Sequence, residues 1–208
     1  VYDLNDDLLN LPQETEIIDK FEKLAAKSDV VIAADYGHGL ITPPIVELLE
    51  DKSGFLAVNT QLNASNISYH SISKYHHADY ICIHEGELRH DYRNRTDSLE
   101  NLVIDLSEKI KTEIIVISCG GAVALAYINN KFSYCPAYAT RIVDRVGAGD
   151  TLLAITSLCF AAGIPADLTL FIGNLAAAQM IATTGTGMKL NKVSLIKYIE
   201  SVLSLIHI

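Results

Sequence analysis

The sequence predicts an α/β fold in which a mostly parallel central sheet is covered by helices on both faces. Short, uninterrupted apolar runs alternate along the chain with segments of helical periodicity. This alternation is typical of parallel sheets whose two faces are both buried. The runs lie at residues 30–34, 55–58, 80–83 and 114–117. A pair suited to a tight turn with positive φ, Asn129-Asn130, then predicts one late β-hairpin between residues 122–128 and 131–135.

The first half of the chain contains the less regular elements. Residues 1–14 are polar and predict an irregular leader, and apolar spacing predicts a helix over 15–27. Thr42 followed by Pro43 reads as a helix start, with the helix ending near residue 51. Residues 64–74 are ambiguous and are taken as helical. The stretch His84-Glu85-Gly86-Glu87 is interpreted as an acidic turn after the third strand.

The second half is mainly helical. An amphipathic pattern predicts a helix over 98–111, and three further helices are expected at 149–162, 167–183 and 192–204. From residue 151 to 188 the only charged side chain is Asp167. Gly163 and Pro165 divide this stretch into halves shorter than the ~20 residues that a bilayer requires, so two buried helices explain it better than a membrane span.

The composition fits one globular domain over residues 1–208. Hydrophobic residues make up 50% and charged residues 20%, and the formal net charge of −9 argues against nucleic acid or an acidic membrane as partner. The four cysteines form no CxxC pair, which favours reduced thiols, and no histidines lie at metal-ligand spacing. No secretion signal is visible, so a cytoplasmic protein is expected.

The predicted strands end in polar or glycine-rich residues. Asp35 and Asn59 follow the first and second strands, the 84–87 turn follows the third, and Ser118-Cys119-Gly120-Gly121 follows the fourth. Ligands of parallel α/β sheets bind at the carboxyl ends of the strands. Each ending alone is explained by a helix cap or a turn, whereas four together indicate a binding site.

The segment Gly147-Ala148-Gly149-Asp150 opens an apolar helix after the hairpin. Glycines allow the backbone to approach a ligand closely, and a helix N-terminus offers unpaired N–H groups to an anion. A carboxylate there would repel that anion unless it takes a proton from a hydroxyl that attacks a phosphoryl group. An ordinary helix start remains the alternative for these residues taken alone.

Residues 144–150, Asp144-Arg145-Val146-Gly147-Ala148-Gly149-Asp150, resemble the second signature of the ribokinase-like, or PfkB-type, carbohydrate kinases, Asp-Thr-x-Gly-Ala-Gly-Asp. The resemblance implies a three-layer ribokinase-like sandwich and transfer of the ATP γ-phosphoryl group to a sugar hydroxyl. It implies Asp150 as the catalytic base. Gly147, Ala148 and Gly149 would form a backbone anion hole for the transferring group.

Other motifs extend this resemblance over about residues 15–203. The family's Asn-x-x-Glu motif, linked to Mg²⁺, is similar to residues 84–87, with histidine in place of asparagine and Glu87 as the implied metal residue. The resemblance also implies an ATP-binding set, and a monovalent cation such as K⁺ beside the loop 184–187. That ATP-binding set is Ser118, Gly120, Gly121, Asn174 and Gly185.

The start of the chain resembles the heptose 7-phosphate kinases, which are halves of bifunctional ADP-heptose synthases. Asp35-Tyr36-Gly37-His38-Gly39 is similar to their Asp-Tyr-x-Lys-Gly stretch, with His38 in place of lysine, and Asn59-Thr60-Gln61 is similar to their Asp/Asn-Pro-Lys turn. Asp35 and Asn59 are therefore the implied substrate-binding residues. The opening sugar-binding signature, the N-terminal β lid and the nucleotidyltransferase domain of those enzymes are absent from this sequence.

Two alternatives to an active sugar kinase remain open. The chain could be an inactive or regulatory nucleotide-binding module, either a fragment or a pseudo-kinase, because the lid and first sugar motif are missing. A dinucleotide-binding α/β protein is the other alternative, although no Gly-x-Gly-x-x-Gly follows the first strand. A fused or separate nucleotidyltransferase domain is a candidate partner, and a homodimer is left open.

Overall fold

The computed structural model describes residues 8–121, 123–139, 143, 146–182 and 190–206. Six strands form one sheet in the order β1-β2-β3-β4-β5-β6. The first four are parallel, β5 is antiparallel to β4, and β6 is antiparallel to β5. The strands are β1 (Val31–Asp35), β2 (Leu56–Thr60), β3 (Tyr80–His84), β4 (Ile114–Ser118), β5 (Val123–Ile128) and β6 (Lys131–Pro136). The predicted strands and the late hairpin are confirmed.

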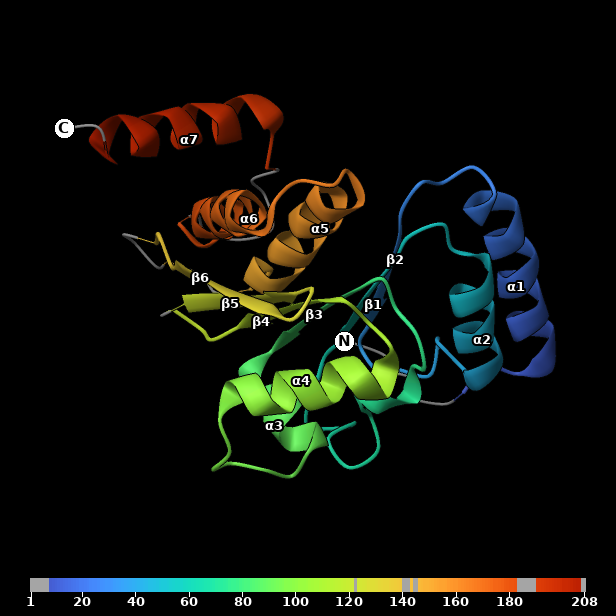
Figure 1. Ribbon diagram of the computed structural model, residues 1–208. Helices are drawn as coiled ribbons and strands as arrows, with labels where there is room; N and C mark the ends of the chain where they lie inside the picture. Colours follow the sequence, from blue (N-terminus) through green and yellow to red (C-terminus); the bar gives the residue numbers. More distant parts are fainter. Residues whose placement is uncertain (1–7, 122, 140–142, 144–145, 183–189, 207–208) are drawn as a thin grey trace.

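Helices cover the sheet on both sides, as expected from its apolar strands (Figure 1). In the figure, α5 and α6 lie on one side of the sheet with α7 outside them, and α3 and α4 lie on the other side. The helices are α1 (Leu11–Ala25), α2 (Pro43–Lys52), α3 (Glu85–Asp91), α4 (Leu99–Ile110), α5 (Ala148–Ala161), α6 (Ala166–Ile181) and α7 (Lys192–Ile206). A short 3₁₀ helix, η1, spans Ile72–Lys74.

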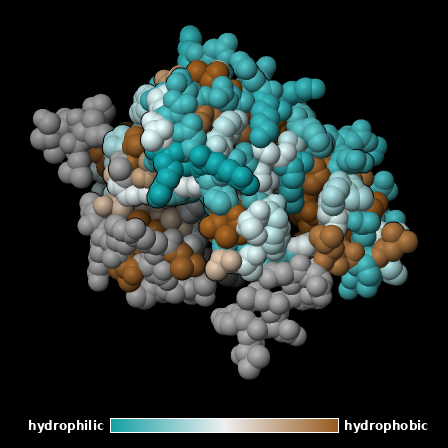
Figure 2. Space-filling view, turned by 90° about the horizontal axis from the view of Figure 1, so that it is seen from below, coloured by the Kyte–Doolittle hydropathy of each residue, from teal (hydrophilic) through white to brown (hydrophobic). Residues whose placement is uncertain are grey.

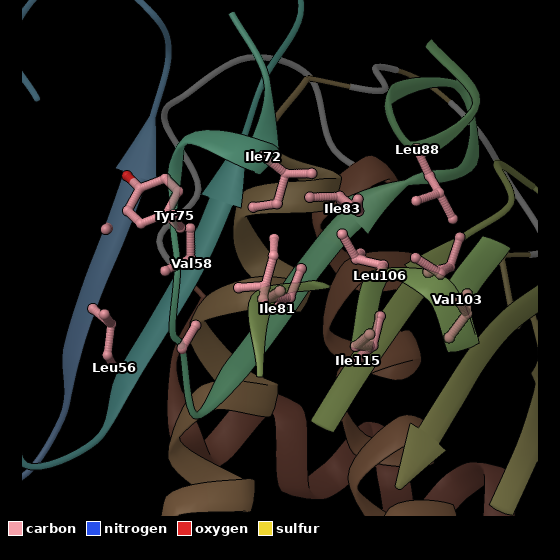
Figure 3. Close-up of a cluster of buried hydrophobic side chains, with 14 of the residues drawn as sticks. Leu56, Val58, Ile72, Tyr75, Ile81, Ile83, Leu88, Val103, Leu106 and Ile115 are labelled. Carbon is pink, nitrogen blue, oxygen red and sulfur yellow. The ribbon is translucent and has the colours of Figure 1, made fainter. Parts of the chain in front are cut away.

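Alternate residues of each strand point into two separate cores, because side chains alternate between the faces of a sheet. On one side, Ile81 and Ile115 pack with Leu106 of α4 and with side chains of α2 and η1 (Figure 3). On the other side, Tyr80 and Val116 pack against α5 and α6. The double coverage explains why the central strands contain almost no polar residues before their carboxyl ends.

Three local predictions need correction. The first helix begins at Leu11, not at residue 15, so residues 11–14 are helical and not part of an irregular leader. The reason is a capping box in which Asn10 and Gln13 bind each other's backbone N–H groups. Of residues 64–74, taken as helical, 64–69 form turns and only Ile72–Lys74 are 3₁₀-helical, since asparagine and serine side chains bind the backbone there.

The third correction concerns the residues after β3. The predicted acidic turn is the first turn of helix α3, with His84 as its N-cap. The His84 side chain accepts a hydrogen bond from the N–H of Gly86 at 2.9 Å, and Glu87 accepts one from the N–H of His84 at 2.7 Å. A histidine is an unusual cap, which is why the helix start could not be read from the sequence.

The outer surface is mainly hydrophilic on the side seen from below in Figure 2, with separate hydrophobic areas. The amphipathic helix α4 shows how this arises, because Leu102, Leu106 and Ile110 are buried while Glu100 and Lys109 are not. Within the part of the chain that the structure describes, no helix has the length and apolar character that crossing a membrane requires.

Candidate active site

A cavity of about 310 Å³ lies between the carboxyl ends of the parallel strands and the N-terminus of α5. This is the place where parallel α/β sheets bind their ligands, because loops from several strands meet there. Most of the site residues expected from the sequence line it. They are Asn59, Glu87, Ser118, Gly120, Gly121, Ala148, Gly149 and Asn174.

Asp150 lies in the first turn of α5, directly after Gly149 of the cavity wall, although neither Asp150 nor Gly147 itself lines the cavity. Its Oδ1 accepts a hydrogen bond of 3.0 Å from Nε2 of Gln61, a residue that lines the cavity. The hydroxyl of Tyr36 lies close to the same carboxylate. Burial, followed by this contact with Asp150, raises the pKa of Tyr36. The carboxylate is therefore held by two side chains that come from the ends of different strands.

The N-terminus of α5 is suited to an anion. Gly147 is the N-cap residue with φ of +81°, a left-handed conformation that glycine adopts readily. Because glycine has no side chain, Gly147 cannot cap the first N–H groups of the helix as serine or aspartate would. Ala148 and Gly149 follow and line the cavity. Backbone N–H groups and the positive end of the helix dipole are thus available to a phosphate.

The end of β4 and the helix α6 form the opposite wall. Ser118 is the last residue of β4, and Gly120 turns the chain with φ of +66°. From α6, the side-chain amide of Asn174 donates to the carbonyl groups of Cys135 and Pro136, each at 3.4 Å. Gly185 and the rest of the loop 184–187 lie outside the described residues, as do Asp144 and Arg145.

Glu87 is a partly buried carboxylate facing the cavity. Its Oε2 accepts the N–H of His84 at 2.7 Å and its Oε1 accepts the N–H of Leu62 at 3.3 Å. Burial raises the pKa of this carboxyl group, while the two backbone hydrogen bonds act in the opposite direction. Among the described residues, no group of three or more His, Cys, Asp or Glu side chains could hold a metal ion.

Asn59 has a buried oxygen that lacks a partner. Its Nδ2 donates to the carbonyl of Cys82 at 2.6 Å, whereas Oδ1 has no hydrogen-bond partner within the described parts of the chain. A buried polar atom without a partner costs about 1–3 kcal/mol, so such atoms usually have a ligand or water to bind. Because Asn59 lines the cavity, its oxygen is available to a ligand there.

Asp35 is placed differently from the other predicted residues. Its carboxylate is buried, forms an ion pair with Lys74, and accepts hydrogen bonds from the Tyr75 hydroxyl at 3.0 Å and the Gly37 N–H at 3.1 Å. It is not part of the cavity wall. These contacts make Asp35 the centre of a polar cluster that shapes the loop after β1.

Two basic residues that could have received a phosphate, Lys74 and Arg89, are already paired. Lys74 binds Asp35 and donates to the Ile41 carbonyl at 3.0 Å, and Arg89 binds Glu85 at 2.7 Å. Of the described residues, those lining the cavity include no lysine or arginine. Backbone N–H groups are therefore the main positive groups that the described wall offers to a phosphate.

Sequence reasoning did not assign Tyr36 or Gln61 to the site. A signal for Gln61 did exist, since residues two apart on an extended segment point to the same side, and Asn59 was already a candidate. Tyr36 stands in the stretch that is similar to Asp-Tyr-x-Lys-Gly, but its contact with Asp150 could not be read there, because that contact joins segments more than a hundred positions apart.

The model of the family described as pfkB family carbohydrate kinase matches residues 8–192 of this chain. Two curated relatives are each named bifunctional protein HldE. The protein from Campylobacter fetus subsp. fetus is 29% identical over 179 residues, and the one from Bradyrhizobium diazoefficiens is 25% identical over 180 residues. These alignments cover 82% and 84% of this chain but only 37% and 36% of the relatives, so the chain spans little more than a third of their length.

Solved structures share the fold at lower identity. Phosphofructokinase-2 from Escherichia coli, in complex with potassium, aligns with a TM-score of 0.75 and 14% identity over 95% of this chain and 64% of that chain. Ribokinase from Thermotoga maritima aligns with a TM-score of 0.69 and 16% identity over 90% of this chain and 61% of that chain. Ribokinase from Arabidopsis thaliana, complexed with ribose and ATP, also has a TM-score of 0.69, with 15% identity over 88% of this chain and 59% of that chain. The architecture is therefore a ribokinase-like α/β sandwich.

Proposed function

This chain belongs to the pfkB family of carbohydrate kinases, and we propose that its cavity transfers the γ-phosphoryl group of ATP to a hydroxyl group of a sugar phosphate. The observation that carries this proposal is the position of Asp150, a carboxylate in the first turn of a helix whose first residues, Ala148 and Gly149, line the cavity. Such a pairing places a proton acceptor beside an anion site, which is the arrangement that phosphoryl transfer to an alcohol requires.

In this mechanism, Asp150 accepts the proton of the attacking hydroxyl as the new O–P bond forms. The N–H groups at Gly147, Ala148 and Gly149, together with the dipole of α5, stabilise the negative charge on the transferring phosphoryl group. Gln61 and Tyr36 hold the carboxylate and leave it fewer orientations. Preorganised groups of this kind act without rearrangement during the reaction, which is why they contribute strongly to the rate.

We assign the opposite wall to the nucleotide. Ser118, Gly120 and Gly121 would bind the ATP phosphates through backbone N–H groups and the serine hydroxyl, since a turn with positive φ brings successive amides together. Asn174 on α6 would border the base, and Gly185 would close the nucleotide site with its loop. In the same loop a monovalent cation such as K⁺ would bind.

Mg²⁺ fits the residues present, because it is usually held by one or two carboxylates, the nucleotide phosphates and water. Glu87 supplies such a carboxylate at the cavity wall. When bound, the ion would neutralise charge on the phosphates. The two backbone hydrogen bonds to Glu87 fix the direction of its carboxylate.

For the acceptor substrate we propose a heptose 7-phosphate, from the similarity to the relatives named HldE. Asn59 would bind a sugar hydroxyl with its free oxygen, and Asp35 would support the substrate loop through its contacts with Lys74 and Gly37. A nucleotidyltransferase, fused or separate, would act at a later step of ADP-heptose synthesis, after the 7-phosphate has been removed. We place this activity in the cytoplasm, where ATP is available, and a homodimer is compatible with it.

Replacing Asp150 by asparagine tests the proposal. Asp150→Asn keeps the shape and removes the proton acceptor, so we expect kcat to fall by about 10²–10⁴-fold while the affinity for ATP stays close to that of the unaltered protein. ATP binding is measured by calorimetry, and turnover by ADP release with heptose 7-phosphate as acceptor. The matched control is Asp167→Asn, which removes the same charge from the first turn of α6, outside the cavity wall.

The outcomes separate the proposal from its main alternative. Loss of turnover in Asp150→Asn alone supports the assignment of the base. ATP binding without turnover in the unaltered protein would instead indicate a nucleotide-binding module that is inactive or regulatory. Equal turnover in the Asp150 and Asp167 variants would refute the role of Asp150.

A further inference from the structure

Two loops that follow neighbouring strands meet at Asp150. Tyr36 comes directly after β1 and Gln61 directly after β2. Nε2 of Gln61 donates a hydrogen bond of 3.0 Å to the Asp150 carboxylate, and the Tyr36 hydroxyl lies close to the same carboxylate. Asp150 itself lies 89 positions after Gln61. The geometry of the carboxylate therefore depends on how well the two loops are held relative to each other.

Strand pairing ends before it reaches these side chains. The register of β1 and β2 runs from Val31 opposite Leu56 to Asp35 opposite Thr60. One more backbone hydrogen bond follows, from the N–H of Gln61 to the carbonyl of Asp35 at 2.9 Å. Beyond it, the carbonyl groups of Tyr36 and Gln61 have no place in the sheet and require other donors.

One buried side chain donates to both carbonyls, and Asn63 adds a longer hydrogen bond of 3.2 Å from its Nδ2 to the Tyr36 carbonyl. The amide Nδ2 of Asn66 donates to the carbonyl of Tyr36 and to the carbonyl of Gln61, each at 2.9 Å. Its Oδ1 accepts the N–H of Asn63 at 2.8 Å, so both ends of the amide are used. Asn66 has no exposed surface, and its side chain fixes the spacing of the two loops from within.

The packing around Asn66 leaves no space for an alternative position. Gly37 has φ of +71°, and a Cβ atom at this residue would lie 2.4 Å from Nδ2 of Asn66 and 2.8 Å from Cγ of His70. Real Cβ atoms do not approach so closely, so glycine is what allows the amide to reach the Tyr36 carbonyl. The absence of a side chain at Gly37 therefore leaves space for the Asn66 amide.

From these contacts we propose that Asn66 is a positioning residue for phosphoryl transfer, which bridges the loops after β1 and β2 so that Tyr36 and Gln61 hold Asp150 together. The inference rests on the proposed function, because it assigns Asn66 an effect on a reaction at Asp150. Asn66 does not line the cavity and touches no reacting atom. Asn66 acts on the reaction indirectly: it holds the backbone carbonyls of Tyr36 and Gln61, and the side chains of these two residues contact Asp150.

The decisive measurement is a mutant cycle in kcat, made in the complete protein with ATP and heptose 7-phosphate. Asn66→Ala should lower kcat by about 10- to 100-fold, since displacement of a catalytic group by about 1 Å can have this effect. Tyr36→Phe combined with Gln61→Ala should lower kcat by a similar factor. Adding Asn66→Ala to that pair should then change kcat by less than about twofold, because Asn66 would have nothing left to position.

A matched control separates positioning from general loss of stability. Leu106→Ala removes a fully buried side chain of α4 in the core shown in Figure 3, away from the cavity. It should destabilise the protein by about 2–5 kcal/mol and leave the kcat of the folded protein unchanged. If Asn66→Ala does not fold, Asn66→Ser replaces it, since a hydroxyl can donate to only one of the two carbonyls and should give a smaller loss of kcat.

A second readout does not depend on turnover. In protein with ¹³C-labelled tyrosine, the pKa of Tyr36 should lie above its ordinary value, and it should fall towards that value in Asn66→Ala but not in Leu106→Ala. If kcat and the Tyr36 titration are both unchanged in Asn66→Ala, the inference is wrong. The inference is also wrong if adding Asn66→Ala to the Tyr36→Phe and Gln61→Ala pair lowers kcat by the same factor as Asn66→Ala does alone. An unaffected kcat in Asp150→Asn would instead overturn the proposed function, so the two failures are distinguishable.

Discussion

Gly147 and Gly149 belong to one motif but face different constraints, which gives a prediction at the scale of single residues. Gly147 has φ of +81°, and a Cβ atom there would lie 3.2 Å from Cε of Met180. Gly149 lies within helix α5, and a Cβ atom there would meet nothing within 4 Å. Gly147→Ala should therefore lower the free energy of unfolding by about 1 kcal/mol, whereas Gly149→Ala should leave it unchanged or raise it by up to about 1 kcal/mol.

Although Gly149→Ala should not destabilise the protein, we expect it to weaken ATP binding. Its added methyl group would enter the cavity wall where the phosphate is proposed to approach, so ATP affinity should fall although the protein is as stable as before. Urea unfolding and calorimetric titration with ATP measure the two effects on the same samples. Unchanged ATP affinity in Gly149→Ala would contradict the assignment of this residue to the anion site.

The candidate site was predictable from single residues only where a motif or a strand ending identified them. Asn59, Ser118 and Gly149 were found this way, and all line the cavity. Gln61 stands in a quoted turn but was not assigned to the site, and Asn66 had no sequence signal. The role of each amide depends on which carbonyl or carboxylate the fold brings next to it. Asp35 was found by its position, but its carboxylate is used by Lys74 and Tyr75 in the buried cluster.

At the scale of elements, the close approach of α5 and α6 depends on Gly173. A Cβ atom at Gly173 would lie 2.6 Å from Cγ2 of Thr156 and 2.9 Å from Cδ1 of Leu152, both on α5. Gly173→Ala should destabilise the protein by about 1–3 kcal/mol, because the helices must separate or the side chains must leave their rotamers. Asn174, the next residue, would move with α6, so nucleotide affinity should decrease as well.

Thr156→Ser offers a compensating change for this prediction. It removes the methyl group that clashes but keeps the hydroxyl that is 2.6 Å from the Tyr80 hydroxyl. The double variant should recover part of the stability lost in Gly173→Ala, giving a non-additive cycle in denaturant unfolding. Strictly additive losses would show that the contact between Gly173 and Thr156 does not limit the packing of the two helices.

Elements with a clear hydrophobic pattern were predictable from the sequence. Elements whose boundaries depend on individual side-chain contacts were not. Uninterrupted apolar strands and the apolar helices α5 and α6 have the predicted type and nearly the predicted ends, because burial decides both. The start of α1 depends on a capping box formed by Asn10, and α3 depends on a cap formed by His84. In each case a pair of side-chain hydrogen bonds determines the boundary, and average propensities do not contain that information.

For the molecule as a whole, buried tyrosines contribute to the loss of stability at high pH, together with the buried Cys82 thiol, whose pKa burial raises to about 12. Tyr75 and Tyr80 are fully buried, and burial is the main cause that raises their pKa values. Burial, followed by the nearby Asp105 and Asp91, raises the pKa of Tyr92 to about 12. In the unfolded chain tyrosines ionise near about pH 10. Between these values the folded protein binds more protons than the unfolded chain, so stability must fall as pH rises.

We therefore expect the free energy of unfolding to decrease from about pH 10 upward, through the folded-state pKa of Tyr92, with the other two tyrosines ionising only on unfolding. Urea unfolding between about pH 8 and pH 12, with tyrosinate absorbance recorded on the folded protein, measures both quantities. Tyr92→Phe should make the decrease shallower. At neutral pH it should be nearly neutral in stability, since the described residues give the buried Tyr92 hydroxyl no partner. A free energy of unfolding that stays constant across this range would show that the tyrosines ionise equally in both states.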